Sequence, residues 1–143
     1  MHLEGTREFA APPEEVYEAL TDPELVAGAI PALESLTVAD HEHWIATVKV
    51  SIAPRLKVAF EVLDRRPPGH ARLRAHGKNF GSTASVDTSF ELAEDGVKRT
   101  AMRYSAEFTL SGLLGRIGEP ALRPIAERQV ARLFAAVDRR VAE

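Results

Sequence analysis

The spacing of apolar residues changes once along this chain, and that change restricts the fold more than any other feature of the sequence. From Leu33 to about Leu110, apolar side chains recur at every second residue, which is typical of strands with one buried face. After Leu110 the repeat lengthens to that of an amphipathic helix. The sequence therefore predicts a sheet with one apolar face, followed by a long helix that covers it.

Turn residues divide the first of these regions into about six antiparallel strands. Pro, Gly, Asn and Asp residues fall at positions 39–40, 53–54, 66–69, 78–81 and 94–96, between stretches of alternating apolar and polar side chains. The helix that follows is expected to begin at Pro120. Its apolar stripe should consist of Leu122, Ile125, Ala126, Val130, Leu133, Val137 and Val141.

The N-terminal part of the chain adds one strand and two short helices. Residues 3–9 alternate as a strand, and Pro12 and Pro13 with two glutamates after them begin a helix. Asp22 is expected to cap a second helix over residues 23–29. The predicted fold is a single α+β domain over residues 1–143, in the order β-α-α-β6-α, with a curved antiparallel sheet of about seven strands wrapped on the C-terminal helix.

Charge and composition exclude several kinds of function. The formal net charge of −3 gives no basic field for nucleic acid, and a chain with 0 Cys has no thiolate for catalysis or metal binding. His41 and His43 lie in an acidic turn without a third ligand, so no metal site is expected. No catalytic residue and no cofactor motif is identified. No export signal and no transmembrane segment is expected, and the expected location is cytoplasmic.

The inward positions of the predicted sheet leave two alternatives open. Many of them are small, among them Ala75 and Ala106, and small side chains would leave a cavity between sheet and helix. Aromatic residues such as Phe60 and Phe90 could instead fill that space. On the first alternative, the residues expected to contact an apolar ligand are Val48, Val50, Phe60, Leu73, Val86, Thr88, Phe90, Tyr104, Phe108, Leu113, Leu114 and Ile117.

Three of those residues belong to a glycine-rich segment at positions 111–120. Its three glycines disfavour helix, so the segment is expected to be loosely held. It is interpreted either as a gate to the cavity or as an irregular lead-in to the last helix. Hydrogen exchange distinguishes the two, because a gate gains protection when ligand binds.

The run from Ala11 to Pro23, with Leu20, Asp22 and Pro23, followed by Ile30-Pro31, resembles the START-like (SRPBCC) superfamily with its helix-grip fold. Within that superfamily the sequence is most similar to the CoxG subunit of carbon monoxide dehydrogenase. The resemblance implies a cavity for lipids, quinones or polyketides between the sheet and the C-terminal helix. It also implies an accessory role beside a molybdenum hydroxylase-type enzyme.

Three functions compete at this point. The first is non-catalytic binding of a hydrophobic small molecule, as in a CoxG-like accessory protein. The second is a polyketide cyclase or aromatase-like enzyme, for which only Thr88 and Tyr104 supply polar groups in the cavity. The third is a protein-interaction module with a filled core. One side of the last helix carries Arg128, Arg132 and Arg139. Peripheral contact of this side with an acidic partner or a membrane surface is a further alternative.

Overall fold

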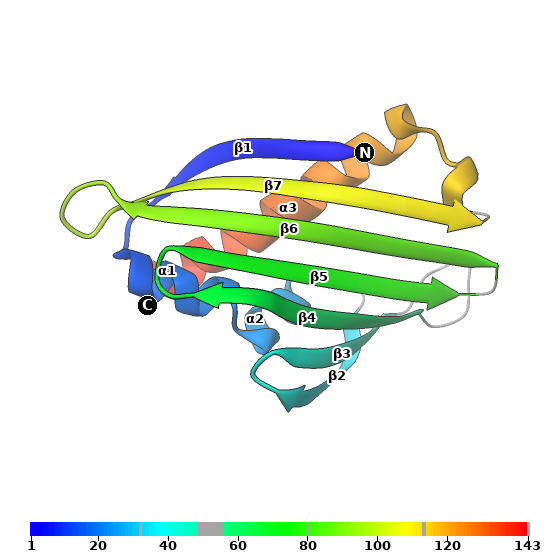
Figure 1. Cartoon of the computed structure of the whole chain (residues 1–143), viewed down its shortest axis with the longest axis horizontal. Coiled ribbons are helices and arrows are strands. Elements are labelled where there is room, and N and C mark those ends of the chain that lie inside the picture. Colours follow the sequence, from blue (N-terminus) through cyan, green and yellow to red (C-terminus); the bar gives the residue numbers. More distant parts are fainter. Residues whose placement is uncertain (32, 49–55, 80, 113, 143) are drawn as a thin grey trace.

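The computed structural model describes residues 1–31, 33–48, 56–79, 81–112 and 114–142. A wide sheet lies over one long helix in Figure 1, with two short helices below the same face. The elements are β1 (His2–Phe9), α1 (Pro13–Leu20), α2 (Pro23–Gly28), β2 (Leu33–Asp40), β3 (His43–Val48), β4 (Leu56–Arg66), β5 (His70–Asn79), β6 (Ser82–Glu94), β7 (Thr100–Gly112), the 3-10 turn η1 (Leu114–Arg116) and α3 (Glu119–Ala142).

The seven strands form one antiparallel sheet in the order β1-β7-β6-β5-β4-β3-β2. β2 to β7 follow one another as a meander, whereas β1 pairs with β7, the strand farthest from it along the chain. Seven antiparallel strands with a long C-terminal helix confirm the predicted helix-grip fold. The register fixes which side chains share the inner face: Thr88 lies between Leu73 of β5 and Ala106 of β7.

The two short helices begin and end as their local sequence dictates. α1 has Pro13 in its first turn and buries Val16 and Leu20. The carboxylate of Asp22 accepts a hydrogen bond from the backbone N–H of Glu24 at 3.0 Å and caps α2. The predicted cap is therefore present.

One part of the predicted stripe on α3 is wrong. Ile125 is 53% exposed, whereas Phe134, which was not placed in the stripe, is 3% exposed and lies against the core. At about 100° per residue, Phe134 is about 60° around the helix from the buried Val137, and Ile125 is about 120° from it. Pairwise spacing alone did not locate the centre of the buried face.

Polar contacts in the C-terminal half of α3 hold it to the rest of the fold. Arg7 of β1 forms an ion pair with Asp138, and its guanidinium lies 5.6 Å from the centre of the Phe134 ring. Arg140 pairs with Asp22 at 2.8 Å. Among the described helices, none is both long enough and apolar enough to cross a membrane.

Candidate functional site

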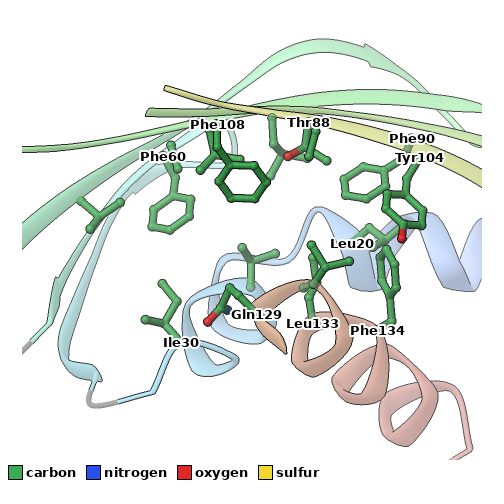
Figure 2. Close-up of a pocket in the computed structure, with 17 residues that line it drawn as sticks. Leu20, Ile30, Phe60, Thr88, Phe90, Tyr104, Phe108, Gln129, Leu133 and Phe134 are labelled. Atoms are coloured by element: carbon green, nitrogen blue, oxygen red, sulfur yellow. The ribbon is translucent and has the colours of Figure 1, made fainter. Parts of the chain in front are cut away.

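A cavity of about 290 Å³ lies between the inner face of the sheet and the helices. Figure 2 shows its two walls, with the sheet above and α3 and the short helices below. The strands contribute Val58, Phe60, Leu73, Ala75, Val86, Thr88, Phe90, Tyr104, Ala106 and Phe108, and the helical side contributes Leu20, Val26, Ile30, Gln129, Val130, Leu133 and Phe134.

The strand residues of this wall come from β4, β5, β6 and β7 at alternate positions, as one face of a sheet requires. Ala75 and Ala106 are part of the wall, and their short side chains leave room that a larger residue would occupy. The cavity therefore arises from small residues on the sheet facing a helix that is held at a distance.

The wall is almost entirely apolar. Only Thr88, Tyr104 and Gln129 bring polar side-chain atoms to it, and no Asp, Glu, Lys, Arg or His is among the described residues that line it. Such a surface favours the uptake of apolar molecules, and a few placed polar groups can fix their orientation. The described wall has no acid–base pair for proton transfer.

Tyr104 lies at one end of the cavity, opposite Phe134 of α3. Its ring meets the ring of Phe134 edge to face, with centroids 4.9 Å apart, and the two residues join β7 to α3. Tyr104 lies over Gly5 of β1, its partner in the sheet register. A Cβ atom at position 5 would come within 2.8 Å of the phenolic oxygen, so glycine leaves the space that this ring uses.

Gln129 holds the helical wall in place. Its side-chain N–H donates to the carbonyl oxygen of Ala29 at 3.2 Å, at the C-terminal end of α2. Because a carbonyl only accepts, this bond fixes which end of the amide faces α2. Gln129 thus ties α3 to α2 beside the cavity.

The predicted ligand contacts are distributed in three ways. Seven of them line the cavity: Phe60, Leu73, Val86, Thr88, Phe90, Tyr104 and Phe108. Val50 and Leu113 lie outside the described residues, as does the side chain of Leu114. Neither Val48 nor Ile117 is among the described residues that line the cavity.

Val48 and Ile117 lie outside the described cavity wall for different physical reasons. Val48 is buried in β3, one strand beyond the four that border the cavity, and pairs with Leu33 and Leu56. Ile117 is 41% exposed between η1 and α3. Alternation places a residue on the correct face of a sheet, but it does not say which strands of that face border a cavity.

Sequence reasoning missed most of the helical wall. Leu20 and Phe134 are apolar residues of ordinary helix patterns and Ile30 follows α2, and nothing in their spacing distinguishes a cavity wall from a filled core. Gln129 carried a usable signal, because it is an uncharged polar residue between Ala126 and Val130 of the expected apolar stripe.

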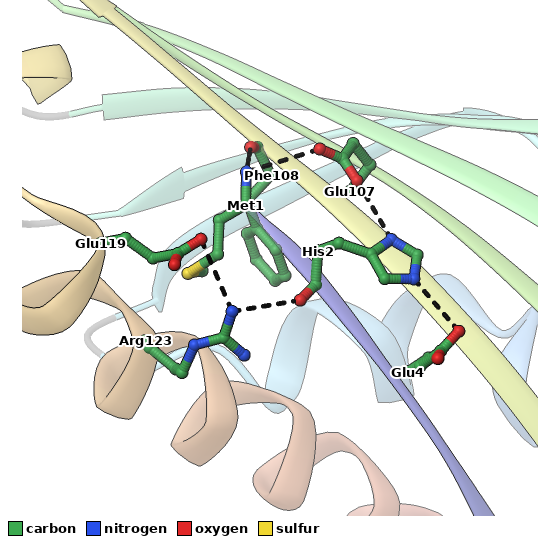
Figure 3. Close-up of polar contacts among 7 residues, drawn as sticks. All are labelled: Met1, His2, Glu4, Glu107, Phe108, Glu119 and Arg123. Atoms are coloured by element: carbon green, nitrogen blue, oxygen red, sulfur yellow. Dashed lines mark hydrogen bonds and ion pairs between the residues drawn. The ribbon is translucent and has the colours of Figure 1, made fainter.

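A polar network joins β1, β7 and α3 beside the cavity (Figure 3). The N-terminal ammonium donates to the carbonyl oxygen of Phe108 at 2.8 Å, and Arg123 donates to the carbonyl oxygen of His2 at 3.4 Å. Hydrogen bonds to Glu4 and Glu107 raise the pKa of His2, and the His2 ring lowers the pKa of Glu107. These contacts hold β1 against α3 and against the part of β7 that carries Phe108.

The outer face of the sheet is charged and paired. Arg72 donates to both oxygens of Asp87, at 2.8 and 2.6 Å, and this guanidinium lowers the pKa of the Asp87 carboxyl. Asp40 raises the pKa of His43 by accepting a hydrogen bond from its ring. In the described ranges, no group of three or more His, Asp or Glu side chains is arranged to hold a metal ion.

Several solved structures share this fold at low sequence identity. A conserved protein from Geobacillus kaustophilus has a TM-score of 0.88 at 21% identity, over 99% of this chain and 95% of its own. A START superfamily protein from Mycobacterium smegmatis has a TM-score of 0.74 at 14% identity, over 99% and 97%. Norcoclaurine synthase from Thalictrum flavum has a TM-score of 0.71 at 13% identity, over 100% and 94%.

Sequence comparison with the curated proteins finds no match. The family model of the carbon monoxide dehydrogenase CoxG subunit matches residues 5–142, which include β4 to β7 and all of α3. The match and the fold agree with the predicted resemblance. The chain therefore belongs to the CoxG family of carbon monoxide dehydrogenase subunits and has a START-like fold.

Proposed function

We propose that this protein binds a hydrophobic small molecule, such as a lipid, a quinone or a polyketide-like compound, in the cavity between the sheet and α3. The observation that carries the proposal is the cavity itself: about 290 Å³, lined by apolar side chains with three polar residues. A space of this size and character is typical of a binding site for a small organic ligand. Family membership supports a role as an accessory protein of a carbon monoxide dehydrogenase.

Native mass spectrometry of the freshly purified protein tests the proposal first. A bound species of defined mass, released by organic extraction, would identify the ligand class. Ligand that binds only the native state also raises the melting temperature. Bare protein whose melting temperature is unchanged by a panel of lipids and quinones would contradict the proposal.

A matched pair of alanines places the ligand inside the cavity. Ala75 lines the cavity on β5, whereas Ala59 of the neighbouring β4 is exposed on the other face. We expect Ala75→Leu to reduce ligand binding by filling the space, and Ala59→Leu to leave it unchanged. Equal effects of the two substitutions would show that the ligand binds elsewhere.

The partner enzyme is tested separately. Co-purification with a carbon monoxide dehydrogenase from the same cells supports the accessory role, and deletion of the gene for this protein should lower carbon monoxide oxidation. Unchanged oxidation in that strain would remove the accessory role and leave ligand binding untouched.

The cyclase-like alternative makes a different prediction at Tyr104, which is the only residue with a titratable side chain in the described wall. If the protein were an enzyme of that class, Tyr104→Phe would retain ligand binding and lose turnover. The interaction-module alternative requires a filled core, and the cavity argues against it.

A further inference from the structure

We propose that the hydroxyl of Thr88 is the hydrogen-bonding partner of an uncharged oxygen atom in the ligand. The cavity would then select neutral, oxygen-bearing apolar molecules such as ketones, esters and alcohols over hydrocarbons and over ionised acids. This inference rests on the proposed function, because it concerns the ligand of the same cavity.

Three polar side chains of described residues line the cavity, and two of them have other roles. Gln129 already donates to the carbonyl oxygen of Ala29 at 3.2 Å. Tyr104 also borders two surface hollows between β1 and α3, which it shares with Glu127 and Val130, so water can reach that end of the cavity. Thr88 borders the apolar cavity, but neither these two hollows nor the two on the outer face of the sheet near Arg74 and Glu91.

Thr88 lies in the middle of the sheet wall with apolar neighbours on both sides. Its partners in the sheet are Leu73 and Ala106, which carry no polar side-chain atom and line the same cavity. Within the described part of the chain, its hydroxyl makes no hydrogen bond. Figure 2 shows this oxygen on the sheet side, across the cavity from Gln129.

When an apolar molecule covers this wall, an unpaired hydroxyl there costs free energy that a valine of the same shape would not. Valine is also at least as suitable for a strand as threonine, so folding alone gives no reason for the hydroxyl. A ligand oxygen at this point would satisfy it. The hydroxyl can donate to a carbonyl oxygen and can donate to or accept from an alcohol.

The same wall argues against an ionised ligand head group inside the cavity. No described lining residue carries a charge that could pair with a carboxylate or phosphate. A buried ion without a partner is strongly disfavoured, so a charged head group would have to remain outside. The ligand portion beside Thr88 is therefore neutral.

The test uses three rigid probes with one ring skeleton: fluorene, fluorenone, which adds a carbonyl, and fluorenecarboxylate, which adds a charge. Binding of each to the full chain is measured by equilibrium dialysis, for the wild type, Thr88→Val and Thr88→Ser. Thr88→Val removes the hydroxyl at constant shape, and Thr88→Ser retains it. Thermal melts of both variants establish that they fold.

We expect the wild type to bind fluorenone more tightly than fluorene, and fluorenecarboxylate most weakly. Thr88→Val should weaken fluorenone binding by roughly threefold to tenfold, the effect of one net hydrogen bond, and should not weaken fluorene binding, because fluorene cannot pair with the hydroxyl. Thr88→Ser should retain most of the preference for fluorenone.

Two results would overturn the inference while leaving the proposed function in place. One is an equal effect of Thr88→Val on fluorenone and fluorene, which is also the result if a retained water satisfies the hydroxyl. The other is tightest binding of the carboxylate. If neither fluorene nor fluorenone binds, and the protein also carries no extractable ligand, the proposed function fails and this inference fails with it.

Discussion

The indole ring of Trp44 stacks on the phenyl ring of Phe60, with the ring centroids 5.5 Å apart and the planes 9° from parallel. Phe60 lines the cavity, whereas Trp44 is its neighbour on β3 and is 1% exposed. The chain has 1 Trp, so its fluorescence reports on this one position. The stacked pair is thus a natural probe for events inside the cavity.

We expect a neutral apolar ligand such as dodecanol to change the emission of Trp44, because it repositions the ring on which the indole stacks. Titration followed by fluorescence measures this directly. Phe60→Leu removes the stacked ring, and its signal change should be smaller at the same ligand occupancy. A signal of the same size in both proteins would mean that the indole senses the ligand by another route.

Gly5→Ala should destabilise the protein, because the new methyl group would come within 2.8 Å of the Tyr104 hydroxyl oxygen. Overpacking of this kind costs about 1–3 kcal/mol, measurable by urea unfolding. In a Tyr104→Ala background the cost should vanish. Gly28→Ala is the control, since nothing lies within 4 Å of its added methyl group. Equal costs of Gly5→Ala with and without Tyr104 would contradict the proposed contact.

Phe134→Ala and Ile125→Ala should have very different consequences although both residues lie on α3. Phe134 is 3% exposed and touches Phe9, Tyr104 and Arg7, so its truncation should cost about 3–5 kcal/mol in free energy of unfolding. Ile125 is 53% exposed, and its truncation should change stability by less than about 0.5 kcal/mol. Similar losses in chemical denaturation would mean that the two faces of α3 are assigned wrongly.

The inner face of the sheet and the cap of α2 could be predicted from the sequence. Alternation along the strands identified the inner face, so Thr88, Tyr104 and the apolar residues beside them were placed correctly on it. The cap at Asp22 was also predictable, because it depends on a neighbouring backbone N–H. These features are local, and local chemistry determines them.

The helical wall of the cavity depends on tertiary packing and was not predictable in the same way. Whether Ala75 and Ala106 face a filled core or a cavity depends on how far α3 lies from the sheet. That distance is set by contacts between remote segments, such as Gln129 with Ala29 and Arg7 with Asp138. None of these pairs leaves a periodic signal in the sequence.

The pair formed by Arg72 and Asp87 predicts a dependence of stability on acid. Arg72, and at 3.6 Å also Arg74, lowers the pKa of the Asp87 carboxyl below its ordinary value of 3.8. The native state therefore binds this proton less readily than the unfolded state. The resulting stabilisation is complete above the ordinary pKa and is lost as the pH falls through the lowered one.

We expect Asp87→Asn to lower the free energy of unfolding at pH 7 by at most about 1 kcal/mol, because both partners are partly exposed. The difference between variant and wild type should shrink as the solution is acidified from about pH 5 to pH 2. Urea unfolding across that range measures it. A difference that stays constant with pH would assign the effect to something other than ionisation of Asp87.

The pairing of β1 with β7 also bears on how the protein is made. Translation delivers β1 before the other strands, yet its partner in the sheet is β7, and α3 follows that strand. On the ribosome β1 cannot pair with β7 until all the strands from β2 to β7 have been synthesised. Contacts between such distant segments slow folding. The part of the cavity wall that α3 supplies is therefore made after the sheet, so a nascent chain leaves the apolar face of the sheet only partly covered, by α1 and α2, until α3 emerges.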